Sequence, residues 1–224
     1  MRDRVFVITG AAGATGKATA RALAERGASL VLIGTDPSRL DSLARDLNLP
    51  AGRVLTVTAN LRNAAAVHSA AEEVTAKFGR LDGLIHLVGG WVGGRTIAAT
   101  PLDDFESMLG QHAWTTFHLF KDFAPLLAKN KWGRVIVVSA PTAASPQGQA
   151  GAYTAAKAAQ ENLVLNLAAE LKEANVTANI VQVKSIDVDG SGQGTTPDEI
   201  AASIVYLCSE EAGKISGARI PLFR

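Results

Sequence analysis

The fold is decided by residues 9–16, which read Thr9-Gly10-Ala11-Ala12-Gly13-Ala14-Thr15-Gly16. A short apolar run at 4–9 leads into this stretch, and a helical pattern at 14–26 follows it. Glycines at positions 10, 13 and 16 let the backbone turn tightly and approach a pyrophosphate, and the following helix N-terminus adds amide donors and partial positive charge. The stretch therefore predicts a dinucleotide-binding strand–turn–helix unit. A tight turn that binds no ligand is the alternative.

Short apolar runs alternate with longer helical patterns along the rest of the chain. The expected strands are 4–9, 29–34, 53–58, 82–88, 133–139, 176–182 and 218–222, and the expected helices are 14–26, 37–47, 63–78, 102–130, 151–174 and 197–208. The strand runs are rich in Val, Ile and Leu without polar alternation, which is typical of strands buried on both faces. We therefore expect an α/β fold, a Rossmann-like doubly wound parallel sheet of about seven strands with helices on both faces. We expect it to form a single domain over residues 1–224.

Proline follows a capping residue at three of the expected helix starts. These starts are Asp36-Pro37, Thr100-Pro101 and Thr196-Pro197. Thr196 also has Glu199 three residues further on, which is the spacing of a capping box. The pattern predicts helix N-caps at Asp36, Thr100 and Thr196.

The composition argues against several classes of function. The net charge is only +1, with basic and acidic residues interspersed, so we expect no nucleic-acid or anionic-membrane partner. Cys208 is the only cysteine and cannot form an internal disulfide, and no His, Cys or carboxylate cluster has metal-ligand spacing. There is no signal peptide and no apolar run near the roughly 20 residues that span a bilayer. These features predict a cytoplasmic protein that needs no metal.

Tyr153 and Lys157 lie four residues apart near the start of the expected helix 151–174, so both side chains fall on one face. An ammonium group beside a phenol favours the phenolate and lowers the phenol's pKa from about 10. The phenol can then exchange a proton near neutral pH while a hydride moves to or from a nicotinamide. After a nucleotide-binding turn, the pair predicts a catalytic site. Two solvated helix residues are the alternative.

Taken together, the motifs resemble the short-chain dehydrogenase/reductase family. They are Thr9-Gly10-x-x-x-Ala14-x-Gly16, Asp82-Gly83-Leu84-Ile85 before Gly89, Gly133-Arg134-Val135-Ile136-Val137-Val138-Ser139, Tyr153-x-x-x-Lys157, and Asn179 near the sixth strand. The resemblance covers nearly the whole chain and implies an NAD(P)-dependent oxidoreductase. It also implies that Asn60 and Leu61 flank the adenine, and that Lys157 holds the nicotinamide ribose. The expected cofactor-binding residues are Gly10, Gly13, Thr15, Gly16, Thr35, Asp36, Asn60, Leu61, Gly89 and Lys157.

The cofactor is NADP or NAD, and the residues after the second expected strand bear on the choice. Asp36 stands about 20 residues past the last glycine, where an acid binds the ribose hydroxyls of NAD, but it is also placed to cap a helix. Thr35, Ser38 and Arg39 could instead hold the 2′-phosphate of NADP. In the family's register the NAD-selecting acid falls at Gly34 and the NADP-selecting arginine at Thr35, and neither is present. This departure favours NADP slightly.

The catalytic positions also depart from the family pattern. Ala140 stands 13 residues before Tyr153, where the family has its catalytic serine. Ser139 or Thr142 is the candidate replacement, unless the substrate needs no hydroxyl donor. The family's proton-relaying asparagine falls at His112, whose neutral imidazole can donate and accept at once. A histidine that is merely hydrogen-bonded within its helix is the alternative. The expected catalytic residues are Tyr153, Lys157, Ser139 and His112.

One local stretch resembles a branch of this family, the quinonoid dihydropteridine reductases. The shared features are Gly89-Gly90-Trp91-Val92-Gly93-Gly94, Gln111-x-x-Trp114-Thr115 and the missing serine. That branch reduces a conjugated pterin, which offers no ordinary carbonyl for a serine to polarise. Trp91 is the expected substrate contact, because an indole can stack on a flat molecule, although it could also be a packing residue.

We therefore expect hydride transfer between a nicotinamide and a small carbonyl or conjugated imine-like substrate, with Tyr153 as proton donor or acceptor. A dihydropteridine reductase-like enzyme is one alternative, and a catalytically weak dinucleotide-binding sensor or scaffold is another. His86 is expected to be a satisfied core histidine. Lys184 is expected either to meet a phosphate or anionic substrate or to be solvated.

The resemblance implies a homodimer or homotetramer, because family members pair the helices that correspond to 102–130 and 151–174. Apolar stripes support this pairing, with Phe117, Phe120 and Phe123 on one helix and Leu163, Leu167 and Leu171 on the other. The loop 187–196 falls where the family keeps its substrate lid, and it is rich in glycine.

Overall fold

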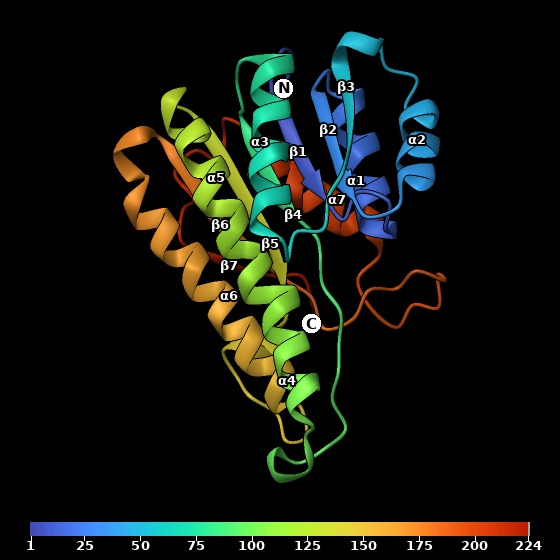
Figure 1. Ribbon diagram of the computed structural model, residues 1–224, viewed down its shortest axis with the longest axis vertical. Coiled ribbons are helices and arrows are strands. Elements are labelled where there is room, and N and C mark those ends of the chain that lie inside the picture. The colour runs from blue at the N-terminus through green and yellow to red at the C-terminus, as the bar shows by residue number, and fades with distance from the viewer. Residues whose placement is uncertain (224) are drawn as a thin grey trace.

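The computed structural model describes residues 1–223 and contains a seven-stranded sheet in the order β3-β2-β1-β4-β5-β6-β7 (Figure 1). The strands are β1 (Val5–Thr9), β2 (Ser29–Gly34), β3 (Val54–Thr58), β4 (Gly83–His86), β5 (Gly133–Ser139), β6 (Val176–Gln182) and β7 (Arg219–Pro221), and all neighbouring pairs among them are parallel. The expected parallel sheet is confirmed. β4 is shorter than expected because the chain leaves the sheet after His86 and enters the segment that lines the site.

Helices cover both faces of the sheet, as the sequence predicts. They are α1 (Ala14–Glu25), α2 (Pro37–Asp46), α3 (Ala64–Phe78), α4 (Leu102–Leu109), α5 (Thr115–Lys129), α6 (Gly151–Glu170) and α7 (Pro197–Leu207). Alternate residues of β1 enter the two cores, with Phe6 and Ile8 against α1, α2 and α7, and Val5 and Val7 against α3, α5 and α6. The sheet therefore lies between two apolar cores, each covered by helices (Figure 1).

The apolar stripes expected to pair subunits are partly used inside the molecule. Phe120, Phe123 and Leu167 are buried in the core between the sheet and helices α5 and α6. Phe117 is 46% exposed and contacts the ring of Trp114, which is 55% exposed. Only this part of the expected stripe on α5 therefore remains on the surface, because the rest of the helix face must cover the sheet.

The expected helix 102–130 is interrupted between α4 and α5 by a π-helical turn, Gly110–Trp114. A π turn accommodates one extra residue by bonding each N–H to the carbonyl five residues back. The hydroxyls of Thr115 and Thr116 donate to the carbonyls of Gln111 and His112, both at 2.7 Å. Threonine side chains thus satisfy carbonyls of the widened turn, which the hydrophobic pattern alone does not reveal.

Two of the three expected helix caps are confirmed. The Asp36 carboxylate accepts the N–H of Arg39, and Thr196 forms a complete capping box with Glu199. The expected Thr100 cap is wrong by one residue, because Pro101 is the N-cap of α4 and the Thr100 hydroxyl donates to the carbonyl of Thr96.

The carboxyl edge of the sheet is the edge at which the site forms. Chain connections from β1 and β4 leave in opposite directions across the sheet, which creates a crevice between these two strands. The segment 87–100, the helix α4 and the loop 187–196 all extend beyond this edge (Figure 1). Within the loop, the Asp187 carboxylate accepts the N–H groups of Ser191 and Gly192, at 2.9 and 2.7 Å.

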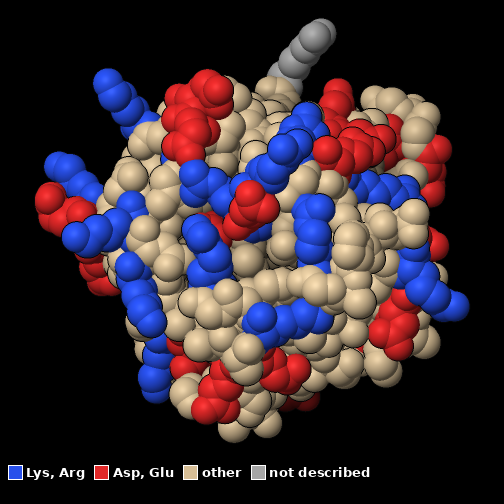
Figure 2. Space-filling model, turned by 90° about the horizontal axis from the view of Figure 1, so that it is seen from above, with Lys and Arg blue, Asp and Glu red and all other residues tan. Residues whose placement is uncertain are grey.

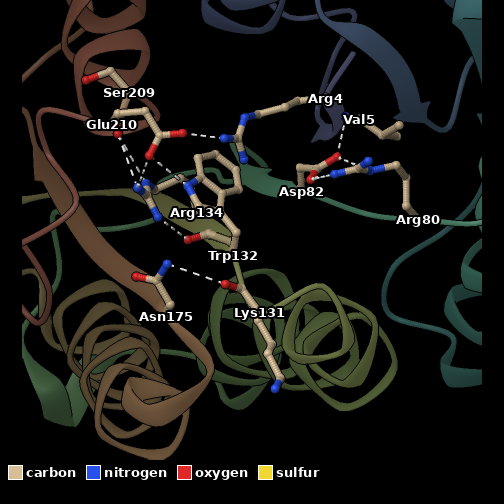
Figure 3. A network of polar contacts seen from close by, with 11 residues as sticks. Arg4, Val5, Arg80, Asp82, Lys131, Trp132, Arg134, Asn175, Ser209 and Glu210 are labelled. Carbon is tan, nitrogen blue, oxygen red and sulfur yellow. Dashed lines mark hydrogen bonds and ion pairs between the residues drawn. The ribbon is translucent and has the colours of Figure 1, made fainter. Parts of the chain in front are cut away.

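Polar contacts join the strands at the opposite, amino edge of the sheet (Figure 3). Asp82 is fully buried and accepts the N–H of Val5 at 2.8 Å and two bonds from the Arg80 guanidinium at 2.9 and 2.6 Å. The buried Arg134 stacks on the ring of Trp132, with 4.2 Å between the guanidinium carbon and the ring centroid. Acidic and basic residues are interspersed over the surface of this edge (Figure 2). The amino edge is therefore a structural network, remote from the crevice.

Candidate active site

The turn after β1 requires glycine for steric reasons. Gly10 has a φ of +68°, and a Cβ there would lie 3.1 Å from the carbonyl carbon of Leu87. A Cβ at Gly16 would lie only 2.4 Å from the carbonyl oxygen of Gly10, so α1 packs directly against the turn. Gly13 is the N-cap of α1. The first amides of α1 thus stand beside a turn without side chains, which is an arrangement that suits a pyrophosphate.

A groove of about 340 Å³ opens from this turn along the carboxyl edge of the sheet. The expected cofactor residues that line it are Gly10, Gly13, Thr35, Asp36, Asn60, Leu61 and Gly89. The structure therefore brings together residues from four separate segments of the chain. Thr15 and Gly16 stand in the first turn of α1 and are not among the lining residues; both are buried in the helix.

A second cavity, of about 420 Å³, adjoins the groove and shares Leu87, Val88 and Gly89 with it. The expected catalytic residues Tyr153, Lys157, Ser139 and His112 all line this cavity, as do Trp91 and Lys184. The groove and the cavity therefore meet at the segment that follows β4. A ligand in the groove can therefore reach the side chains of the cavity.

Lys157 is buried, and its ammonium group is held by two acceptors. Nζ donates to the carbonyl of Val138 at 2.9 Å and to Oε1 of Gln160 at 2.9 Å. Burial lowers the pKa of Lys157 to about 7, and the nearby Glu161 carboxylate opposes this shift. Lys157 can therefore exist in either protonation state near neutral pH.

The expected lowering of the Tyr153 pKa is wrong for this structure. Burial raises the pKa of the Tyr153 phenol above its ordinary value. The physical reason is that loss of water penalises the phenolate, while a lysine with a pKa of about 7 supplies only part of a positive charge at neutral pH. The lysine, and not the tyrosine, is the member of the pair whose pKa is brought close to neutrality.

His112 stands in the π turn and faces both the cavity and the tyrosine. Its ring lies edge-on to that of Tyr153, with 5.5 Å between the ring centroids. Burial lowers the pKa of His112 to about 3, so the imidazole is neutral at physiological pH. Because Nε2 lies 2.9 Å from the carbonyl of Gly90, the proton is on Nε2 and the lone pair is on Nδ1. Nδ1 is buried and has no partner within residues 1–223.

Ser139 is the candidate hydroxyl residue that lines the cavity. Its side chain is 2% exposed and lines the cavity, and Oγ bonds to no described residue. Ala140 is also buried but is not among the residues that line the cavity. Thr142, the other candidate, has a buried hydroxyl without a partner in the described chain but does not line the cavity either. Of the three positions, only Ser139 belongs to the residues that line the cavity.

The sequence matches the family described as short chain dehydrogenase over residues 4–197. The chain belongs to the short-chain dehydrogenase family. This membership, together with a site that faces a nucleotide-sized groove, makes the protein an NAD(P)-dependent oxidoreductase.

Named relatives cover the chain almost completely. A meso-2,3-butanediol dehydrogenase of Serratia marcescens is 30% identical over 237 residues, which cover 98% of this chain and 93% of the relative. A 3-oxoacyl-[acyl-carrier-protein] reductase of Aquifex aeolicus is 25% identical and covers 97% of this chain and 94% of its own. A solved short chain dehydrogenase from Bacillus anthracis superposes with a TM-score of 0.89 at 25% identity, over 99% of this chain and 95% of that structure.

Two arginines line the groove of this dehydrogenase in addition to Thr35 and Asp36. Arg39 donates from Nη2 to the carbonyl of Ala12 at 2.8 Å, and Arg62 lines the same groove. Asp36 Oδ1 accepts both the Ser38 hydroxyl at 2.7 Å and the Arg39 N–H at 3.1 Å, and these bonds lower its pKa. Asp36 is thus a capping residue that also faces the groove.

His86 is a satisfied core histidine, as the sequence predicts. Its two ring nitrogens lie 2.7 Å from the Thr9 hydroxyl and 3.2 Å from the Thr115 hydroxyl, and burial lowers its pKa to about 3. No group of three or more His, Cys, Asp or Glu side chains within residues 1–223 could hold a metal ion. None of the helices in that range is both long and apolar enough to cross a membrane.

Three site residues were missed by reasoning from the sequence. Gln111 and Arg62 line the groove, and Gln160 binds the buried Lys157. A signal for Gln160 was present, because it follows Tyr153 and Lys157 at the spacing i, i+4, i+7, which defines one face of a helix. Arg62 and Gln111 come from a loop and from the π turn, where no periodic pattern indicates which way a side chain points.

Proposed function

We propose that this dehydrogenase transfers a hydride between NADP(H) and a small carbonyl or conjugated imine-like substrate, with Tyr153 as the proton donor. One observation carries the proposal. Tyr153, Lys157 and Ser139 line one cavity, and this cavity shares Leu87, Val88 and Gly89 with the groove that begins at the glycine turn. A binding-only protein would have no need of an uncompensated buried hydroxyl beside a buried Tyr–Lys pair.

The residues of the groove fit a dinucleotide. A Cβ at Gly16 would collide with the Gly10 carbonyl and one at Gly10 would crowd Leu87, so these glycines let α1 and the segment after β4 pack closely on the turn, as a dinucleotide-binding unit requires. Asn60 and Leu61 would flank the adenine, the turn would hold the pyrophosphate, and Gly89 and Lys157 would face the nicotinamide ribose. When bound, the reduced nicotinamide supplies a hydride, which is two electrons and one hydrogen nucleus.

The chain's own residues would supply the proton and stabilise the charge. The Tyr153 hydroxyl donates its proton to the substrate oxygen or nitrogen as the hydride arrives at the adjacent carbon. Lys157, as an ammonium, opposes the negative charge that remains on the phenol oxygen. The Ser139 hydroxyl donates a hydrogen bond to the same substrate atom. The neutral His112 offers the Nδ1 lone pair to a donor on the substrate.

NADP(H) is the proposed nucleotide because of the charges at the ribose end of the groove. Arg39 lines the groove together with Thr35 and Asp36, so an additional phosphate could meet its guanidinium group, and Arg62 adds a second positive charge to the lining. The Asp36 oxygen that faces α2 is already used in capping that helix. NAD-dependent members of the family carry an acidic residue at the position of Gly34, where it binds the ribose hydroxyls, and this chain has glycine there instead.

Two substrate classes deserve testing. The butanediol dehydrogenase and the 3-oxoacyl reductase act, by their names, on hydroxyl or carbonyl compounds, which supports a carbonyl substrate here. A quinonoid dihydropterin is the second candidate. Trp91 is 64% exposed and lines the cavity, so its indole is free to stack on a flat ring.

The test is a titration of the purified protein with NADH and NADPH, followed by addition of acetoin, diacetyl or a quinonoid dihydropterin. We expect tighter binding of NADPH and its oxidation by at least one of these compounds. Tyr153→Phe should lose turnover by more than about 10²-fold and keep nucleotide affinity. Nucleotide binding without oxidation of any compound, or unchanged turnover in Tyr153→Phe, would favour the sensor or scaffold alternative.

A homodimer or homotetramer is proposed for the assembly. The support is the exposed pair of aromatic rings formed by Trp114 of the π turn and Phe117 of α5. Light scattering coupled to gel filtration measures the mass directly. A Trp114→Ser/Phe117→Ser double variant should shift the mass towards that of the monomer, while a monomeric wild-type protein would contradict the proposal.

A further inference from the structure

Behind the catalytic pair, α6 carries a fully buried polar side chain, Gln160. Its Oε1 accepts a hydrogen bond from Lys157 Nζ at 2.9 Å, and its Nε2 donates to the Thr116 hydroxyl at 3.0 Å. The Thr116 hydroxyl in turn donates to the carbonyl of His112 at 2.7 Å. A continuous chain of hydrogen bonds therefore runs from the lysine to the π turn that carries the histidine.

The orientation of the Gln160 carboxamide is fixed by chemistry. An ammonium group only donates, so the oxygen of Gln160 must face Lys157 and the nitrogen must face Thr116. The Thr116 hydroxyl uses its single proton on the His112 carbonyl and is left as the acceptor that Nε2 needs. Gln160 Nε2 also lies 3.5 Å from the His112 carbonyl, so both the amide and the Thr116 hydroxyl donate towards the π turn.

The two acceptors of Lys157 determine where its remaining proton points. A lysine ammonium has three N–H groups, and Val138 and Gln160 engage two of them within residues 1–223. Nζ lies 4.0 Å from where a Cβ at Gly89 would stand, at the junction of the groove and the cavity. The third N–H is therefore directed to the space that the nucleotide and the phenol would share.

We propose that Gln160 is a positioning residue that aims the Lys157 ammonium at the catalytic space and couples it to the π turn through Thr116. The proposal rests on the proposed function for its catalytic consequence. Its structural content, the hold of Gln160 on the ammonium form of Lys157, is independent of any substrate.

The charged and titratable groups around Lys157 come from three elements. Tyr153 and Glu161 are on α6, His86 is on β4, and His112 is in the π turn. His86 and His112 are neutral near pH 7, so Glu161 is the main opposing charge. Gln160 adds a neutral acceptor to this setting, and its removal should destabilise the ammonium form relative to the amine.

The test measures the pKa of Lys157 in the full-length protein by NMR of ¹³C-labelled lysine, with Lys157→Met to assign the resonance. Gln160→Met removes the acceptor with little change in volume and should lower the Lys157 pKa by about one unit. Gln160→Glu keeps an acceptor and adds a charge, so it should raise this pKa. Asn162→Ala is the matched control, because its carboxamide is on the exposed side of α6 and bonds only the Ala158 carbonyl.

Turnover provides the second readout. Gln160→Met should lower kcat by about tenfold and shift the pH profile of kcat in the direction of the Lys157 pKa. Thr116→Val, which removes the anchor of the Gln160 amide, should act in the same direction more weakly and add little to Gln160→Met. If Gln160→Met fails to fold, Thr116→Val and Gln160→Glu carry the test.

A Lys157 pKa that does not respond to these Gln160 and Thr116 variants overturns the proposal, whatever happens to thermal stability. If the pKa moves as expected but no variant, including the wild type, oxidises a nucleotide, the positioning role stands and the proposed function fails. If turnover is present and insensitive to Gln160→Met, the positioning role is refuted and the proposed function stands.

Discussion

Ser139→Ala separates a catalytic hydroxyl from a structural one, because the structure predicts opposite effects on activity and on stability. Ser139 Oγ is buried and makes no hydrogen bond to residues 1–223. Its removal therefore breaks no bond in the fold and relieves a buried unsatisfied polar atom. A group of this kind costs about 1–3 kcal/mol, so the free energy of unfolding should stay constant or rise by about 1 kcal/mol.

The effect on catalysis should be large. A preorganised donor to the atom that gains negative charge contributes roughly 10²–10³ in rate, or about 2.7–4 kcal/mol. We expect kcat of Ser139→Ala to fall by about that factor on a carbonyl substrate and by much less on a quinonoid dihydropterin, which offers no ordinary carbonyl.

The assay is nucleotide oxidation followed by absorbance, combined with urea denaturation of the same samples. Thr142→Val is the matched control, since its hydroxyl is also buried and unpartnered in the described chain but lies outside the cavity lining. Equal turnover of Ser139→Ala and wild type on a carbonyl substrate would refute the assignment of Ser139. A loss of turnover accompanied by an equal loss in Thr142→Val would refute the reasoning from cavity lining.

Three further predictions concern stability and nucleotide choice. Asp82→Ala should lower the free energy of unfolding by about 3 kcal/mol, because it leaves Arg80 and the Val5 N–H without their buried partner, and urea denaturation measures this loss. Nucleotide affinity should be unchanged in that variant, since Asp82 is at the amino edge. Acidification should destabilise the fold, because the pKa values of buried His86 and His112 are about 3 when folded and 6.5 when unfolded. The unfolded chain binds more protons between these values, so stability is present above about pH 6.5 and is lost as the pH falls, by roughly 2 kcal/mol per histidine at about pH 5. Equal urea midpoints at about pH 7 and pH 5 would contradict this account. Arg39→Ala should raise the Kd for NADPH about tenfold and leave that for NADH within about twofold, and an equal effect on both nucleotides, measured by fluorescence titration, would count against the proposed 2′-phosphate contact.

The sequence was sufficient for the fold because its strands and helices are strongly patterned. Continuous Val, Ile and Leu runs such as 29–34 and 176–182 can be buried only between two layers, and the glycine turn at 9–16 indicates the first strand–helix unit. Helix boundaries were harder to predict where polar side chains form hydrogen bonds to the backbone of the helix. The π turn at Gly110–Trp114 depends on the hydroxyls of Thr115 and Thr116, which a hydrophobic pattern does not report.

The sequence predicted which residues form the candidate site better than it predicted their pKa values and their orientation. Motif spacing identified Tyr153 and Lys157, but the direction of the tyrosine pKa was wrong because burial depends on three-dimensional packing. The choice between Ser139 and Ala140 could not be made from residue order, since it depends on which side chain faces the cavity. Gln160 could have been predicted from its spacing to Tyr153 and Lys157. It was missed because a glutamine among alanines belongs to no recognised motif.

The π turn between α4 and α5 determines how the protein would respond to the deletion of a single residue. The widened turn already absorbs one extra residue, so losing one residue from it would restore a regular helix and leave α4 and α5 near their present orientation. α5 is held against the sheet by Leu119, Phe123 and Leu127, so the change would fall on the residues of the turn itself, His112 among them. A single-codon deletion within 110–114 should thus leave a folded protein whose histidine has left the cavity. Point substitutions can alter the chemistry of this site gradually, whereas a change of length here acts as an all-or-none event.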